Sequence, residues 1–426
     1  MNARTEAAES FFRGGPHDLA SASWPRVGFE VWLAAGPLLA LLGHGPSDIW
    51  LSSLAIIFLV ESSIRSDWSW ARTIWFQAAI AFWAWAALVS SLSQWPADGL
   101  ENALPWIRFP VFAAAIMVWL GQCEHRRRRM MIAMLVGCGT SIAILFAERL
   151  SDPTAARLYG TFSQAPKPGW YVLGIGLPLV LMALQKFRTE LQWGWVALPA
   201  TLLVLATAMS TGEIAVTLKI ILAITLIVLL GSKFWQLLLV GASASFGLVT
   251  VLMLYPAVLA RFTKALTERL PWLPSSDYYP AWLGGWTTML QNPLAGVGAH
   301  NYQAYCQTFD DAQRLETLGI SVCYPHPHHL YLQIGAETGV IGLVLFVVFA
   351  AALLVRVGRM HVRAAAPPFS LTALVLLLVA LWPIAPYSNA FGQHMNFFTA
   401  FHIGWALALV GTAVAVRTKP TAQPPG

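Results

Sequence analysis

Apolar stretches long enough to cross a membrane follow one another along most of this chain. A spanning helix needs roughly 20 mostly apolar residues. Of the 426 residues, 57% are hydrophobic and only 11% are charged, whereas average globular domains carry about 25% charged residues. The 20 tryptophans and 10 tyrosines suit the aromatic belts found at bilayer interfaces. The sequence therefore predicts an all-α integral membrane protein.

The apolar stretches divide the chain into about twelve predicted transmembrane helices and one large loop. The helices are expected near residues 28–44, 47–62, 74–94, 104–121, 129–148, 168–185, 193–211, 214–231, 234–255, 329–355, 370–388 and 396–416. The predicted division is an N-terminal tail over 1–27, helices 1–9 over 28–255, a large loop over 256–328, helices 10–12 over 329–416 and a C-terminal tail over 417–426.

Basic residues are distributed unequally between alternate loops, and this predicts the orientation. With the N-terminus inside, the inner loops carry Arg65, Arg72, Arg126, Arg127, Arg128, Arg129, Lys186, Arg188, Lys233, Arg356, Arg359 and Arg363. The short outer loops carry only Arg149, Arg157 and Lys167. Because Lys and Arg are enriched in cytoplasmic loops, both tails are predicted to be cytoplasmic and the large loop external. The net charge of +6 thus follows topology and does not indicate a nucleic-acid partner, and the four consecutive arginines are interpreted as a topology anchor.

Loops beyond about 15 residues are either functional or disordered. The large outer loop is expected to be structured, because part of it has the residue spacing of a helix. Trp282, Trp286 and Met289/Leu290 recur at helical spacing. They predict an amphipathic helix over residues 278–291 that lies on the membrane surface.

A histidine-rich segment ends this loop, with His326, His328 and His329 inside four positions. Pro327 suits the first turn of a helix that starts near His328. The positive end of a helix dipole disfavours imidazolium, so the pKa of His328 is expected to fall and its ring to stay neutral near pH 7, ready to accept a proton.

The residues around the histidines suggest how the segment is held. An external compartment permits a disulfide between Cys306 and Cys323 that would pin it, the alternative being two buried thiols. His329, Gln333 and Glu337 form one polar stripe at i, i+4 and i+8, which in a membrane helix faces a wet cavity or a partner helix.

Simpler interpretations of the same residues remain open. A histidine at a membrane interface can be a wetted surface residue or a helix cap. His326 and His328 could both bind zinc, but no further Cys/His pair accompanies them, so no metal site is predicted. Gly335 and Gly339 form a small-xxx-small pair for close helix packing.

Cations gather near the outer face, where they could bind an anionic substrate. Arg157, Arg261 and Arg269 lie in the outer loops, and Lys219 lies inside the eighth helix, roughly 8–9 Å from its outer end at about 1.5 Å per residue. Such a set suits a lipid-linked diphosphate, and membrane lipid headgroups are the equal alternative.

With these residues in view, the chain resembles the O-antigen ligase and polymerase superfamily of bacterial polysaccharide enzymes, chiefly over residues 280–345. The matching motifs are Pro293-Leu294-Ala295-Gly296-Val297-Gly298, then His326-Pro327-His328-His329-Leu330-Tyr331-Leu332-Gln333, then Glu337-Thr338-Gly339, with Gly160-Thr161-Phe162 in an earlier outer loop. In the family these read as a Pro-x-x-Gly-x-Gly turn, His-Pro-His-Asn-x-Tyr-Leu-Gln and Glu-x-Gly.

The resemblance implies transfer of a glycan from an undecaprenyl diphosphate carrier to lipid A–core or a similar acceptor, at the periplasmic face of the bacterial inner membrane. It implies no metal and no nucleotide sugar. The family's essential histidine corresponds to His328, which would activate the acceptor hydroxyl. The supporting residues would be His326, His329 and Glu337. The cations that would stabilise the departing diphosphate are Arg157, Lys219, Arg261 and Arg269.

His329 holds the family's asparagine position, two further positions depart from the family pattern more seriously, and other functions stay open. Ile214 and Tyr278 stand where the family commonly has arginines. A polymerase of the same superfamily differs only in its acceptor, and a protein-glycosylating transferase is a further alternative. A transporter would predict internal repeats and helices interrupted at mid-membrane, neither of which is evident in the sequence.

Overall fold

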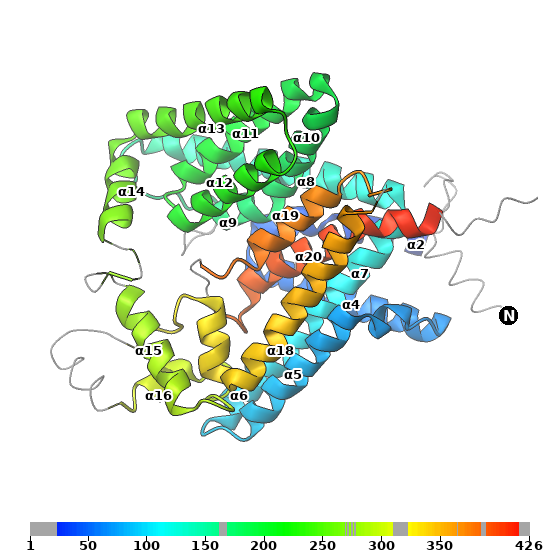
Figure 1. The fold of residues 1–426 in the computed structure, drawn as a ribbon, viewed down its shortest axis with the longest axis vertical. Helices are drawn as coiled ribbons and strands as arrows, with labels where there is room; N and C mark the ends of the chain where they lie inside the picture. The colour runs from blue at the N-terminus through cyan, green and yellow to red at the C-terminus, as the bar shows by residue number, and fades with distance from the viewer. Residues whose placement is uncertain are drawn as a thin grey trace, which may run out of the picture.

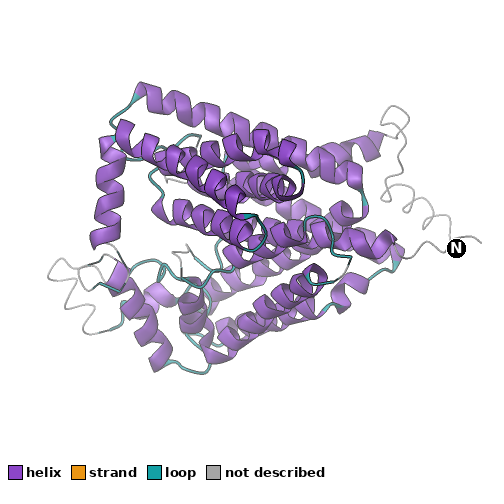
Figure 2. Ribbon diagram, turned by 45° about the horizontal axis from the view of Figure 1, so that its top comes forward, coloured by secondary structure: helices purple, strands orange, loops and turns teal. Residues whose placement is uncertain are grey.

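The chain folds into a bundle of helices. The computed structural model describes residues 24–161, 168–268, 270, 272–273, 276, 278–309, 323–363, 365–384 and 389–416, the last five by their backbone alone. Throughout this described part every regular element is a helix and no strand occurs (Figure 2). The prediction of a helical membrane protein is confirmed.

Every predicted transmembrane range overlaps a helix of the structure. In chain order the elements are α2 Trp24–Ala34, α3 Gly36–Leu39, η2 Ala40–Leu42, α4 His44–Arg65, η3 Ser69–Arg72, α5 Ile74–Ser91, α6 Pro96–Ala103, η4 Leu104–Ile107, α7 Arg108–Gln122, α8 Glu124–Ser151, α9 Pro168–Tyr171, η5 Val172–Gly176, α10 Leu177–Thr189, η6 Leu191–Trp193, α11 Gly194–Ser210, α12 Ile214–Leu229, α13 Phe234–Leu254, α14 Pro256–Glu268, α15 Tyr278–Gln291, α16 Tyr302–Cys306, α18 Leu330–His361, α19 Ser370–Ala380 and α20 Gln393–Val416.

Not all of these helices meet the length and apolarity expected of a full membrane span. Among the described residues, 8 helices are long and apolar enough, or 9 when the pair Trp24–Ala34 and Gly36–Leu42, bent by 51°, counts as one span. Ile214–Leu229 and Ser370–Ala380 are apolar but shorter. The structure therefore supports a multi-span protein, and the count of about twelve stays a prediction.

Helices α7 and α20 pack closely at the centre of the bundle. A Cβ on Gly404 of α20 would lie 2.7 Å from the side chain of Ile116 and 2.9 Å from the carbonyl oxygen of Ala113. Gly121 of α7 faces the backbone of Ala408 in the same way, at 3.5 Å. Small residues let membrane helices approach at backbone distance, and this contact fixes the centre on which the other helices pack.

Helix α18 carries the histidine segment at its N-terminal end and runs beside α5 for most of its length (Figure 1). It is not one continuous helix, because Gly339 has φ 67° and ψ −176°. The break separates a short first segment, residues 330–338, from a longer second segment, residues 340–361. The sequence predicted a single uninterrupted helix from 329, and that prediction is wrong at this residue.

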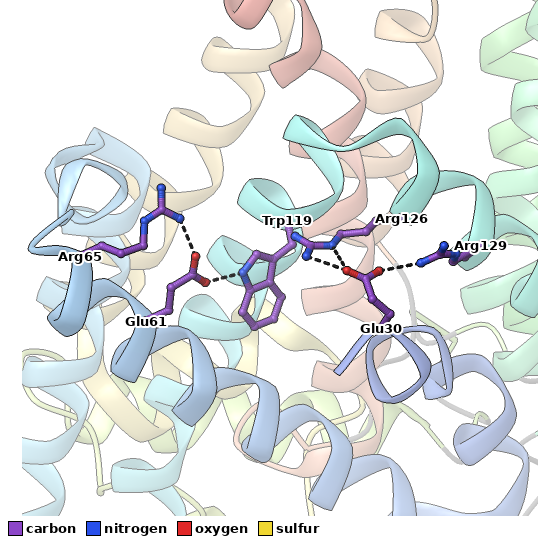
Figure 3. A network of polar contacts seen from close by, with 6 residues as sticks. All are labelled: Glu30, Glu61, Arg65, Trp119, Arg126 and Arg129. Carbon is purple, nitrogen blue, oxygen red and sulfur yellow. Dashed lines mark hydrogen bonds and ion pairs between the residues drawn. The ribbon is translucent and has the colours of Figure 1, made fainter. Parts of the chain in front are cut away.

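Two of the four consecutive arginines do more than anchor topology. Arg126 is 4% exposed, its Nε donates to Oε1 of Glu30 at 2.8 Å, and its Nη2 forms an ion pair with the same oxygen at 2.7 Å (Figure 3). Arg129 donates to the other oxygen of Glu30 at 3.0 Å (Figure 3). Removing one partner of a buried pair leaves an uncompensated charge, so these arginines tie α8 to α2.

A second buried carboxylate lies in the same region. Glu61 of α4 accepts from Arg65 at 2.7 Å and from the indole N–H of Trp119 at 2.6 Å (Figure 3). The Trp119 ring also meets Phe29, next to Glu30, at 5.0 Å between centroids. The two networks therefore join α2, α4, α7 and α8 at the end of the bundle that the charge pattern predicts to be cytoplasmic.

Candidate functional site

The break in α18 is filled by the loop that follows α15. Interrupting the helix at Gly339 frees backbone carbonyls that would otherwise bond within it. The carbonyl of Ala336 accepts from the N–H of Val297 at 3.1 Å, and that of Glu337 accepts from the N–H of Gly298 at 2.8 Å. The outer loop is thereby fastened by its backbone to the first segment of α18.

Glycine is required on both sides of this contact. Gly296 has φ +67°, and a Cβ there would collide with the backbone of Glu337. Gly339 also has φ +67°, and a Cβ there would collide with the carbonyl of Leu294. The left-handed region of φ favours glycine, and no side-chain movement relieves a clash with backbone. The Pro-x-x-Gly-x-Gly and Glu-x-Gly motifs are thus two halves of one contact.

The histidine segment is pinned at its start and enters α18 through His329. Cys306 and Cys323 form a disulfide with their Cα atoms 5.5 Å apart. Helix α18 begins at Leu330, two residues after His328, near the expected start, and Pro327 therefore lies before its first turn. His329 is the N-cap residue, and its Nδ1 accepts from the N–H of Leu332 at 3.1 Å.

His328 adopts a left-handed conformation just before that cap, with φ +56°. Its ring centroid lies 4.2 Å from that of His326 and 5.2 Å from that of Tyr278 in α15. Tyr278, which the resemblance places at an arginine position, contacts the histidine ring edge to face. Trp282 meets His329 in the same way at 4.8 Å, so α15 buttresses both rings.

The histidines are held in their neutral form. Burial, reinforced by the neighbouring His328 and His300, lowers the pKa of His326 to about 3. Burial also lowers the pKa of His328 and of His329. The expected direction for His328 is therefore found, although its cause is desolvation and not the end of a helix. Neutral imidazoles near pH 7 can accept a proton.

The polar stripe of α18 leads away from the histidines into the bundle. Gln333 and Glu337 are both 0% exposed, and Nε2 of Gln333 donates to Oε1 of Glu337 at 3.1 Å. The same nitrogen lies 3.2 Å from Oδ1 of Asn389, and the N–H of Ala390 donates to Oε1 of Gln333 at 2.8 Å. The stripe therefore faces the chain segment before α20, which is not a helix, where the sequence suggested a wet cavity or a partner helix.

Two residues of this network were not found from the sequence. His300 has φ +63°, and its Nδ1 accepts from Nδ2 of Asn389 at 2.9 Å. The only signal for His300 was its place two residues after Gly298. Asn389 is more than fifty positions away from Gln333 and carries no local signal. The structure brings His300, Asn389 and Glu337 together with the three histidines singled out from the sequence.

The predicted cations do not form one cluster. Arg157 lies 3.9 Å from Glu213, and Nε of Arg261 donates to the carbonyl of Gly212 at 2.8 Å. Both flank the turn between α11 and α12. Burial raises the pKa of Glu213 to about 7, against the lowering effect of Arg157 and Arg261. This turn is a candidate anion site with a carboxyl that loses its charge close to neutral pH.

The other two predicted cations lie elsewhere. Lys219 is 5% exposed inside α12, with its Nζ 5.3 Å from the centroid of the Trp170 ring. Arg269 lies outside the described residues. Arg149, an outer-loop residue by sequence, is 2% exposed and donates to the carbonyl of Ser210 at 2.6 Å. It therefore holds α8 to α11.

No metal site is formed in the part of the chain that the structure describes. There is no group of three His, Cys, Asp or Glu side chains placed to hold an ion among those residues. His326 and His328 thus have no third ligand within the described site.

In a comparison with known protein families, residues 101–347 match the family described as O-antigen ligase. This match covers more than half of the chain. The chain belongs to the O-antigen ligase family. No curated protein matches it at a significant level.

In this member of the O-antigen ligase family, the matched region includes the whole histidine segment and both cysteines of the disulfide. It also includes Arg157, Lys219, Arg261 and Glu337. Asn389 lies beyond the matched region, so the chain segment that precedes α20 completes the site from outside it. Membership makes the chain a ligase- or polymerase-type glycosyltransferase acting on lipid-linked glycans in a bacterial membrane.

Proposed function

We propose that this protein transfers a glycan from undecaprenyl diphosphate to a hydroxyl of lipid A–core or a similar acceptor, at the periplasmic face of the inner membrane. The observation that supports this most is the meeting of half-buried neutral histidines with the Gln333–Glu337 network at the end of a disulfide-pinned loop. Such a site can take a proton in a place where two membrane-bound substrates can meet.

His328 acts as the general base in this proposal. The acceptor oxygen attacks the anomeric carbon of the glycan, and its proton passes to the neutral ring of His328. The bond between that carbon and the diphosphate oxygen breaks, and the lipid diphosphate leaves. Tyr278 and the disulfide hold the ring in place, because they contact it or fix the segment that carries it.

Arg157 and Arg261 hold the diphosphate of the donor in this proposal. Arginine favours phosphate oxygens through paired N–H donors. Both flank Glu213, and the Nε of Arg157 has no hydrogen-bond partner among the described residues. The pair would take the place of the family arginine at the position that Ile214 occupies here.

A polymerase of the same family would use the same residues, with a second glycan chain as its acceptor. A chromosomal deletion assayed by polysaccharide gel separates the two. A ligase deletion should remove capped lipopolysaccharide and leave lipid-linked polymer to accumulate. A polymerase deletion should leave products with a single repeat unit. Unchanged lipopolysaccharide and unchanged lipid-linked glycan would contradict both functions.

The proposal needs the loop over residues 256–328 to be periplasmic and both tails to be cytoplasmic. A reporter fused at position 361 should therefore be active in the cytoplasm, and one fused at position 312 should be active outside. An external signal at 361 would reverse the side on which the histidines lie.

A further inference from the structure

A cavity of about 370 Å³ opens at the opposite end of α18 from the histidines. It lies between the C-terminal end of α10, the C-terminal end of α18 and the start of α19. Its lining residues are Gln185, Lys186, Arg188, Thr189, His361 and the stretch 366–370. The charge pattern of the loops predicts that this end faces the cytoplasm.

The charge of the cavity is basic. Lys186, Arg188 and His361 line it from two helices, and no acidic side chain of the described chain is among its lining. Glu190 pairs with Lys186 at 2.9 Å and offsets one charge. Arg188 is exposed. A Cβ on Gly231 would lie 2.8 Å from Nη1 of Arg188, so glycine at position 231 avoids a clash with the guanidinium.

The walls of the cavity are fixed by polar contacts. Gln185 donates to the carbonyl of Pro368, and its Oε1 accepts from Oγ1 of Thr372 at 2.7 Å. Nδ1 of His361 lies 3.0 Å from Oγ of Ser370. These bonds join α10, α18 and α19 around the opening, so the cations project from a built frame.

The surroundings have the chemistry of a membrane interface. Directly after α10, Leu191 is 67% exposed and Trp195 is 88% exposed. Exposed tryptophans and leucines beside basic residues are typical of the headgroup region of a bilayer. Basic pockets between transmembrane helices on the cytoplasmic side bind the headgroups of anionic lipids.

We propose that this cavity binds the phosphate headgroup of an anionic phospholipid, with Arg188 and Lys186 as its main contacts and the acyl chains lying toward Leu191 and Trp195. The inference does not depend on the proposed transferase function. Each basic residue near an anionic membrane surface contributes about fivefold in affinity, so loss of both should weaken binding about 25-fold.

A footprint on the full-length protein tests this site directly. A single cysteine introduced as Ala366→Cys lies on the exposed rim, while Cys123 and Cys138 are buried. Thiol labelling should be slower in vesicles that contain phosphatidylglycerol than in vesicles of phosphatidylcholine alone. Equal labelling in the two kinds of vesicle would overturn the proposal, as would equal protection by inorganic phosphate, which would indicate a free anion.

Charge variants identify the residues responsible. In the Ala366→Cys background, Lys186→Gln with Arg188→Gln should abolish the protection by phosphatidylglycerol. The matched control is Arg127→Gln with Arg128→Gln, which removes two basic residues on the same predicted side but outside the cavity. Loss of protection in the control as well would mean that surface charge in general, and not this cavity, attracts the lipid.

Discussion

Replacing Gly339 with alanine should destabilise the protein strongly, although the change adds one methyl group. The residue has φ 67° and ψ −176°, a conformation open almost only to glycine, and other residues held in such regions cost about 1–3 kcal/mol. The new Cβ would also collide with the carbonyl of Leu294, which is backbone and cannot rotate away.

The chain could relieve this strain only by straightening α18. The two loop-to-helix hydrogen bonds of Val297 and Gly298 would then be lost, as would a third from the N–H of Val340 to the carbonyl of Pro293, at about 1 kcal/mol each. Either route costs about 3 kcal/mol or more. We expect a clear fall in the thermal unfolding midpoint of the purified protein in detergent, together with loss of glycan transfer.

Gly358→Ala provides the matched control, since it lies on the same helix and a Cβ at that position would meet no atom within 4 Å. Alanine is favoured over glycine by about 1 kcal/mol inside a helix, so this variant should be as stable as the native chain or slightly more so. If Gly339→Ala unfolds at the same temperature as Gly358→Ala, the account of the break is wrong.

Two further predictions concern charges. Glu213 should lose its proton as pH rises through about 7. Its carboxylate then competes with a phosphate for the flanking arginines. The affinity for the donor, measured as the Kd of a lipid diphosphate, should therefore fall with rising pH. Glu213→Gln should flatten that dependence, and an unchanged profile would remove Glu213 from the donor site. Arg126→Ala should destabilise the protein by about 3–5 kcal/mol, because it strands the buried carboxylate of Glu30, while Arg128→Ala should change the unfolding midpoint little. Equal effects of the two arginine variants would show that the pair with Glu30 carries no special weight.

The sequence predicted those features that depend on local pattern. Apolar length located the helices, and the spacing of Trp282 and Trp286 located α15 at the bounds that the structure gives, Tyr278–Gln291. The common face of Gln333 and Glu337 follows from their spacing. The predicted external position of the loop permitted a disulfide between Cys306 and Cys323, which the structure forms, and left two buried thiols as the alternative.

The break at Gly339 could not be predicted in this way. Gly335 and Gly339 have the spacing that favours close packing of continuous helices, and the same spacing accommodates a break. What decides between the two is the loop containing Gly296, whose amides take up the carbonyls of the broken turn. That partner is about forty residues distant in the chain, so no local pattern shows it.

Long-range contacts also explain the other errors. The run beginning at Arg126 indicates only topology in the sequence, because its buried partner, Glu30, lies 96 residues earlier. Asn389 and His300 are brought to the histidines by tertiary packing, across 89 positions. The charge pattern predicts only the side of the membrane on which the cations lie, and in the structure Lys219 is buried against Trp170, apart from the turn that Arg157 and Arg261 flank.

The central claim is that His328 takes the proton of the acceptor, and glycan transfer by the purified protein in vesicles measures it most directly. His328→Ala should lower the rate by about 10²–10⁴-fold, the usual contribution of a general base, while the disulfide and the unfolding midpoint stay as in the native chain. His326→Ala should lower it less. Because burial lowers the pKa of His328, the native rate should stay level as pH falls to about 6.5, the ordinary pKa of histidine, and drop only below it. Near-native transfer by His328→Ala, or full loss in His326→Ala with retention in His328→Ala, would contradict the account.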